Sequence, residues 1–198
     1  SQITTHNTES NMFNPFQPLE KIKTEVYTSM PAKFRKKGRT AWSDPNRQGA
    51  EVECFLEGPS FDRSGNLWIV DIPYGRIFRI SPKQEWELIV QYDGWPNGLK
   101  FHKDGRAFIT CYKQGLLVLD PKTGKLETLL GTAFSEGFKG LNDLHFASNG
   151  DLYFTDQGQT GIADPTGRVY RLRANGALDR LADNVPSPNG ITMSTTDK

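Results

Sequence analysis

The sequence predicts an all-β protein that forms part of a β-propeller, with four-stranded antiparallel blades of which about three and a half are present. Three observations indicate this fold. One motif recurs at Glu57, Asn97, Asn142 and Asn189, and its copies align without a gap. The copies begin 40, 45 and 47 residues apart, a spacing typical of a propeller blade. No segment sustains a long helical period.

Each complete copy of the motif carries an aromatic residue four positions after its start and a glycine eight positions after it. The copies read EGPSFDRSGNLW, NGLKFHKDGRAF and NDLHFASNGDLY, followed by the shorter NGITMS. Between them lie short runs rich in β-branched and aromatic residues, separated by turns that contain Gly and Pro. The pattern predicts blades over 51–94, 95–137 and 138–185, and the start of a fourth over 186–198.

The residues before the first blade divide into two parts. We expect residues 1–20 to form a polar arm and residues 21–198 to form the partial propeller. The segment 24–30, TEVYTSM, is expected to be extended and to close the ring by adding a strand to the final blade. Because the sequence stops within the fourth blade, we expect a fragment of a longer protein, or else two chains that together complete a ring.

The composition excludes several classes of partner. A net charge of +1 provides no basic field that would attract nucleic acid or anionic lipid, and the basic run 33–39 is interpreted as a solvated face. No apolar stretch is long enough to cross a membrane, and no export signal is visible. We therefore expect a cytoplasmic protein, although a cleaved signal would leave no trace. Cys54 and Cys111 are expected to be free thiols.

The repeated first positions are the candidate metal ligands. Glu57, Asn97, Asn142 and Asn189 should lie at one end of the central tunnel, because each begins the inner strand of a blade. Their oxygens suit a hard cation, Ca²⁺ first, with Zn²⁺, Mn²⁺ and Mg²⁺ as alternatives. Asparagine is also a common turn residue, but the register shared by three blades favours a site. The set carries one negative charge, so a carboxylate from a later blade is expected.

A second register follows 14 residues later, where the next strand returns to the same end of the blade. It contains Asp71, Cys111 and Asp156. Asp156 is interpreted as a contact for a substrate hydroxyl or as a support for a metal ligand, the alternative being an acidic strand end in solvent. His102 and His145 are expected to pack or to face solvent rather than to act as a general base.

Four segments resemble the gluconolactonase and senescence-marker-protein (regucalcin-like) family: FLEGPSFDRSGNLWIVDIPYGRIFRIS, PNGLKFHKDGRAFIT, GLNDLHFASNGDLYFTD and SPNGITMS. The resemblance extends over about residues 30–198 and implies a six-bladed propeller. It further implies a central divalent metal held by Glu57, Asn142 and Asn189, which would form the catalytic set. An additional ligand, which would be the acid/base aspartate, is expected beyond residue 198.

The resemblance also implies an activity. Family members hydrolyse lactones, mostly of sugar acids, so we expect metal-dependent hydrolysis of a lactone such as gluconolactone, in which a cation polarises the carbonyl and a carboxylate activates water. Asn97 and Asp156 are then expected to contact the substrate. The expected partners are this small molecule and a second chain or the missing C-terminal half, with no nucleic acid and no membrane.

Four alternatives remain open at this point. The propeller is a calcium-binding or interaction protein without turnover, or an inactive fragment of the enzyme. A strictosidine-synthase-like enzyme shares the propeller but lacks the metal ring, and the oxygen-bearing positions in register argue against it. A phosphotriesterase side reaction, as in paraoxonases, would use the same metal chemistry on a different leaving group.

Overall fold

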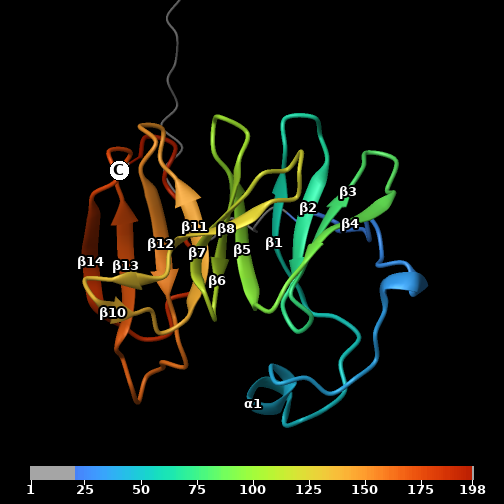
Figure 1. Ribbon diagram of the computed structural model, residues 1–198, viewed down its shortest axis with the longest axis horizontal. Helices are drawn as coiled ribbons and strands as arrows, with labels where there is room; N and C mark the ends of the chain where they lie inside the picture. Colours follow the sequence, from blue (N-terminus) through green and yellow to red (C-terminus); the bar gives the residue numbers. More distant parts are fainter. Residues whose placement is uncertain (1–20, 198) are drawn as a thin grey trace, which may run out of the picture.

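The strands form three four-stranded antiparallel sheets in sequence order, which confirms the predicted fold class (Figure 1). The structure is a computed structural model, and it describes residues 21–197. The expected polar arm, residues 1–20, lies outside the described residues. The sheets stand side by side, each with its first strand innermost, as in consecutive blades of a propeller.

Each blade runs from its inner to its outer strand along the sequence. The first comprises β1 (Leu56–Phe61), β2 (Leu67–Asp71), β3 (Arg76–Ile80) and β4 (Trp86–Gln91). The second comprises β5 (Pro96–Phe101), β6 (Ala107–Cys111), β7 (Gly115–Leu119) and β8 (Leu126–Leu130). The third comprises β11 (Leu141–Phe146), β12 (Leu152–Asp156), β13 (Gly167–Leu172) and β14 (Leu178–Val185).

Smaller elements surround the blades. A two-stranded ribbon follows the second blade, formed by β9 (Thr132–Ala133) and β10 (Glu136–Gly137). Two short helical elements precede the first blade, η1 (Ala32–Phe34) and α1 (Ser43–Arg47). In the part of the chain that the structure describes, no helix has the length and apolar character needed to span a membrane.

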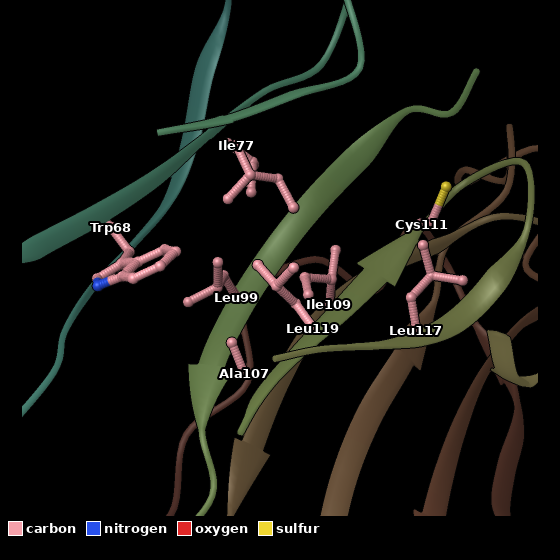
Figure 2. Close-up of a cluster of buried hydrophobic side chains, with 9 residues drawn as sticks. Trp68, Ile77, Leu99, Ala107, Ile109, Cys111, Leu117 and Leu119 are labelled. Carbon is pink, nitrogen blue, oxygen red and sulfur yellow. The ribbon is translucent and has the colours of Figure 1, made fainter. Parts of the chain in front are cut away.

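The cores lie between neighbouring blades. One buried cluster joins Trp68 and Ile77 of the first blade to Leu99 and Ile109 of the second (Figure 2). A second cluster joins the second and third blades in the same way, with Phe108 packed against Phe146 at 5.1 Å between ring centroids. Because burial of apolar area is the main favourable term in folding, these contacts set how the inner strands stand beside one another.

The segment 24–30 does not form the predicted closing strand, since it pairs with no sheet. Instead Met30 is buried against Phe78 and Trp86, and Thr28 Oγ1 accepts a hydrogen bond from the Trp86 indole at 3.0 Å. The physical reason is that a strand needs a neighbour, and the final blade that it was expected to join is not in this chain. The segment covers the first blade instead.

The start of the predicted fourth blade is likewise not a ladder strand, because residues 186–197 are assigned no strand. A strand forms only against a hydrogen-bonded neighbour, and the second strand of that blade is not part of this chain. The segment is held by polar contacts to the third blade, among them the bond from the Ile191 amide to Asp143.

Candidate metal and substrate site

Three of the candidate ligand positions, Glu57, Asn97 and Asn142, lie at or beside points where the ladder from an inner strand to the next strand is interrupted. The register between β1 and β2 shifts between Glu57 and Ser60. The same shift recurs between β5 and β6 and between β11 and β12, where it encloses Asn97 and Asn142. A β-bulge re-aims a side chain out of the regular alternation and is common beside active sites. In all three blades the ladder is therefore irregular at this position or directly beside it: Asn97 and Asn142 lie inside the irregular stretch, and Glu57, which still pairs with Val70, borders it.

Two glycines allow the inner strands to approach one another closely. A Cβ on Gly58 would lie 2.9 Å from the carbonyl oxygen of Asn97, and a Cβ on Gly98 would lie 2.9 Å from that of Asn142. Both distances are too short for a real side chain, so only glycine permits this backbone contact. As a result Glu57, Asn97 and Asn142 come to the same end of three adjacent inner strands.

No donor among the described residues bonds to the side-chain oxygens of Glu57, Asn97 or Asn142. Asn142 donates through Nδ2 to Oε1 of Gln157 at 2.8 Å, and Asn97 donates through Nδ2 to the carbonyl oxygen of Trp95 at 3.1 Å. Each amide group is held by its nitrogen, so its Oδ1 remains an open acceptor among the described residues. Glu57 is exposed, and no cation in the described part of the chain pairs with its carboxylate.

Asn189 lies after β14 and is held against the third blade by its backbone. Its carbonyl oxygen accepts a hydrogen bond from Thr155 Oγ1 at 2.8 Å. Two residues later, the Ile191 amide donates to Asp143 Oδ2 at 3.0 Å. The Asn189 side chain is exposed. The fourth ring position is therefore fixed by bonds to β11 and β12, although it belongs to no strand.

The chemistry of this donor set fits a hard divalent cation, because carboxylate and amide oxygens are the ligands that Ca²⁺ takes in proteins. No three His, Cys, Asp or Glu side chains among the described residues come together as a metal cluster. Glu57 is therefore the only carboxylate of the set, and amide oxygens supply the rest. We call Glu57, Asn97, Asn142 and Asn189 the ring residues.

The aspartates of the second register lie behind the ring residues and are fully buried. Asp156 accepts hydrogen bonds from the amides of Lys139 at 3.1 Å and Gly140 at 2.8 Å, and burial raises the pKa of its carboxyl group. Asp71 accepts one from the Phe55 amide at 2.7 Å and pairs with buried Arg76. Each carboxylate thus holds the segment that enters an inner strand, which favours the supporting role for Asp156.

Several residues near the ring were not predicted. Gln157 links Asn142 to the segment after β14, since its Nε2 donates to Ser187 Oγ at 2.8 Å. Thr110 and Thr155 donate to backbone carbonyls of the following blade. One signal was available in the sequence, because both threonines occur 13 residues after a ring asparagine.

His102 and His145 both lie in packed positions. The His102 ring lies 5.2 Å from that of Phe146 and 5.9 Å from that of Phe108, and its Nδ1 is 2.9 Å from Asp104 Oδ2. His145 is half-buried within β11, where it faces Tyr153 of β12 in the ladder.

A hollow of about 550 Å³ lies at the other end of the inner strands. Its lining includes the repeated aromatics Phe61, Phe101 and Phe146, which are the last residues of β1, β5 and β11. Glu57, Asn97 and Asn142 are the second residues of those strands, so the hollow is separate from the candidate metal site.

Blades of four antiparallel strands, with oxygen-bearing side chains at the starts of adjacent inner strands, define a partial β-propeller with a candidate cation ring. The sequence model of the SMP-30/gluconolactonase/LRE-like family matches residues 55–198. The chain belongs to this family. The match begins just before β1 and covers all three blades.

The chain is similar to curated proteins named lactonase. The chain is 31% identical over 170 residues to lactonase drp35 of Staphylococcus aureus (strain USA300), a match that covers 79% of this chain and 49% of that protein. It is 28% identical over 198 residues to lactonase drp35 of Staphylococcus epidermidis (strain ATCC 12228), covering 94% of this chain and 59% of the relative. The chain thus spans about half the length of the curated relatives it matches.

Solved structures share the fold. A gluconolactonase from Xanthomonas campestris superposes with a TM-score of 0.66 at 22% identity, over 73% of this chain and 52% of that one. A calcium-binding regucalcin from Agrobacterium tumefaciens gives a TM-score of 0.51 at 22% identity, over 66% and 43%. At this identity the likeness establishes the propeller fold and nothing finer.

Proposed function

We propose that the protein to which these blades belong is a metal-dependent lactonase that hydrolyses a sugar-acid lactone, of which gluconolactone is the model substrate. The observation that carries the proposal is the repeated irregularity of the inner strands, which encloses Asn97 and Asn142 and directly follows Glu57, at one end of three adjacent blades. Membership of the family and relatives named lactonase support the same class of reaction.

In this proposal Glu57, Asn142 and Asn189 would hold a divalent cation, Ca²⁺ first. Such a cation supplies Lewis-acid chemistry, polarising the ester carbonyl and stabilising the oxyanion that develops on it. The Asn142 amide is oriented for this role by its bond to Gln157. Orientation by a second residue is the usual way in which a protein fixes a metal ligand.

Asn97 and Asp156 have different parts in the proposal. The Asn97 Oδ1 is an open acceptor in the ring, suited to the hydroxyl groups of a sugar acid. Asp156 is buried behind the ring and fixes the segment that leads into β11, so it supports Asn142 without touching substrate. A water-activating carboxylate is expected from residues outside this chain.

A second candidate function is calcium binding without turnover. One observation favours it for these residues taken alone, namely that the ring holds a single carboxylate, Glu57, and offers no second one as a general base. The two functions differ in whether lactone is consumed.

The test is hydrolysis of glucono-δ-lactone followed by pH-stat titration, with Ca²⁺ and after its removal by EDTA. We compare the full-length protein, which supplies the water-activating carboxylate, with its Glu57→Gln variant, which keeps the shape of the side chain and removes the charge. The control is Glu85→Gln, the same change at an exposed turn of the same blade. Calcium-dependent hydrolysis that Glu57→Gln abolishes supports the proposal. A hydrolysis rate that neither EDTA nor Glu57→Gln lowers contradicts the proposal. Calcium binding without hydrolysis favours the second function.

A further inference from the structure

Two buried threonines join each blade to the ring residue of the next. Thr110 on β6 donates from Oγ1 to the backbone carbonyl oxygen of Asn142 at 2.6 Å. Thr155 on β12 donates from Oγ1 to the backbone carbonyl oxygen of Asn189 at 2.8 Å. Thr110 and Thr155 are 0% and 3% exposed, so neither hydroxyl has water as a ready alternative partner.

The first blade shows that this position does not need a hydroxyl for packing. The residue in the same register is Val70, which is as buried as the threonines and has nearly the same shape. The carbonyl oxygen of Asn97 lies against Gly58 there, as that of Asn142 lies against Gly98, and no side-chain hydroxyl among the described residues donates to it. Valine fills the site, so the hydroxyls of the other two blades serve the bond that they donate.

Thr155 also holds its own blade. Its Oγ1 accepts a hydrogen bond from the Asp143 amide at 3.0 Å while it donates to Asn189. The Asp143 carboxylate in turn accepts from the Ile191 amide at 3.0 Å. The backbone around Asn189 is therefore bound on both sides by a short network that begins at β12.

We propose that Thr110 and Thr155 are positioning residues, which fix the main chain of Asn142 and Asn189 and so direct the side chains of these two ring residues. The inference rests on the proposed function, because that proposal makes Asn142 and Asn189 metal ligands. The hydrogen bonds themselves do not depend on it. The second and third blades would then each position the metal ligand that follows them in the sequence, so that Asn142 and Asn189 take their places only when neighbouring blades are in register.

The test uses Thr155→Val, which keeps the β-branched shape found at Val70 and removes the hydroxyl. Thr155→Ser restores the hydroxyl, and Thr128→Val is the control on an exposed face of β8. The first measurement is amide hydrogen exchange without metal. We expect faster exchange at Asp143 and over 187–193 in Thr155→Val, with wild-type rates in the other two variants.

The second measurement is the calcium dissociation constant by calorimetry. Loss of one positioning hydrogen bond should weaken binding by roughly fivefold to tenfold in Thr155→Val, and Thr155→Ser should recover it. Thr110→Val is an independent variant, with the exchange effect expected over 141–144, should the first variant not fold.

The outcomes separate the two proposals. Unchanged exchange in the valine variants overturns the positioning role, whatever the metal does. Faster exchange with unchanged calcium affinity also overturns it, because the bond would then not direct a ligand. If the wild-type chain binds no calcium, the proposed function fails for these residues. Faster exchange in Thr155→Val would then still show that the Thr155 hydroxyl fixes the backbone around Asn189.

Discussion

Replacement of Asp156 by alanine tests whether this carboxylate is a structural support. Asp156 is fully buried at the end of β12 and accepts hydrogen bonds from the amides of Lys139 and Gly140. Asp156→Ala leaves both donors without an acceptor. The segment cannot easily turn to find another one, because a Cβ at Gly140 would lie 2.2 Å from the Tyr112 ring, and the backbone is correspondingly confined.

The expected loss of stability in Asp156→Ala follows from these two hydrogen bonds. A buried unsatisfied amide costs about 1–3 kcal/mol, and the partly buried Lys139 amide costs less than the buried Gly140 amide. We therefore expect Asp156→Ala to lower the free energy of unfolding by about 2–4 kcal/mol. Asp156→Asn keeps one acceptor oxygen and should lose about half as much.

The assay is urea unfolding followed by circular dichroism, with unchanged m-values required so that the midpoints report stability. Asp183→Ala is the control, since this exposed carboxylate on β14 lies 3.9 Å from Arg180 and makes only a weak surface pair. A loss below about 0.5 kcal/mol for Asp156→Ala, equal to that expected for a surface substitution, would refute the supporting role.

Three further substitutions test other parts of the fold. Asp71→Ala leaves the buried Arg76 guanidinium without its partner and should cost about 3–5 kcal/mol in urea unfolding. Gly98→Ala puts a Cβ 2.6 Å from Thr110 Oγ1 and should cost about 1–3 kcal/mol, seen as a lower Tm. Burial alone would raise the pKa of Asp62, but its hydrogen bonds outweigh this and lower it. Asp62 should therefore add stability above about pH 4 that is lost as the pH falls further. In Asp62→Asn the free energy of unfolding should fall less steeply with pH below about pH 4.

Each of the three substitutions has a matched control and an outcome that would contradict the expectation. For Asp71→Ala the control is Glu87→Ala, which breaks the exposed pair with Arg79 and should cost at most about 1 kcal/mol. An equal cost for the two variants would show that burial of the Asp71–Arg76 pair does not matter. At Gly137 an added Cβ meets nothing within 4 Å, and a Gly98→Ala loss no larger than that of Gly137→Ala would show that the inner strands can move apart. For Asp62, identical acid unfolding of wild type and Asp62→Asn would contradict the lowered pKa.

The repeat made the blades predictable, because four local features coincide in every copy. The turn glycine, the inner aromatic, the β-branched runs and the start of the inner strand share one register, so local and global preferences agree. The placement of Glu57, Asn97 and Asn142 at one end followed from that register alone. Their role as ligands stays a prediction.

Other features depend on partners that a single sequence does not reveal. Whether Asp156 faces solvent or the interior depends on the path of the segment before β11, which passes over it. The segment 24–30 has a sequence suited to a strand, but it packs on the first blade because no neighbouring strand is present. Val70, Thr110 and Thr155 stand one residue before the second register and were readable as a repeat, while the carbonyls that the threonines reach lie in the next blade.

The most direct test of the ring is a calorimetric titration of the wild-type chain and Glu57→Gln with Ca²⁺, the metal alone, in a chelator-treated buffer. The account predicts binding by the wild type and its loss in Glu57→Gln, because this change removes the only carboxylate among the ring residues. Equal affinity in the two proteins would contradict the assignment of the metal site to the starts of the inner strands.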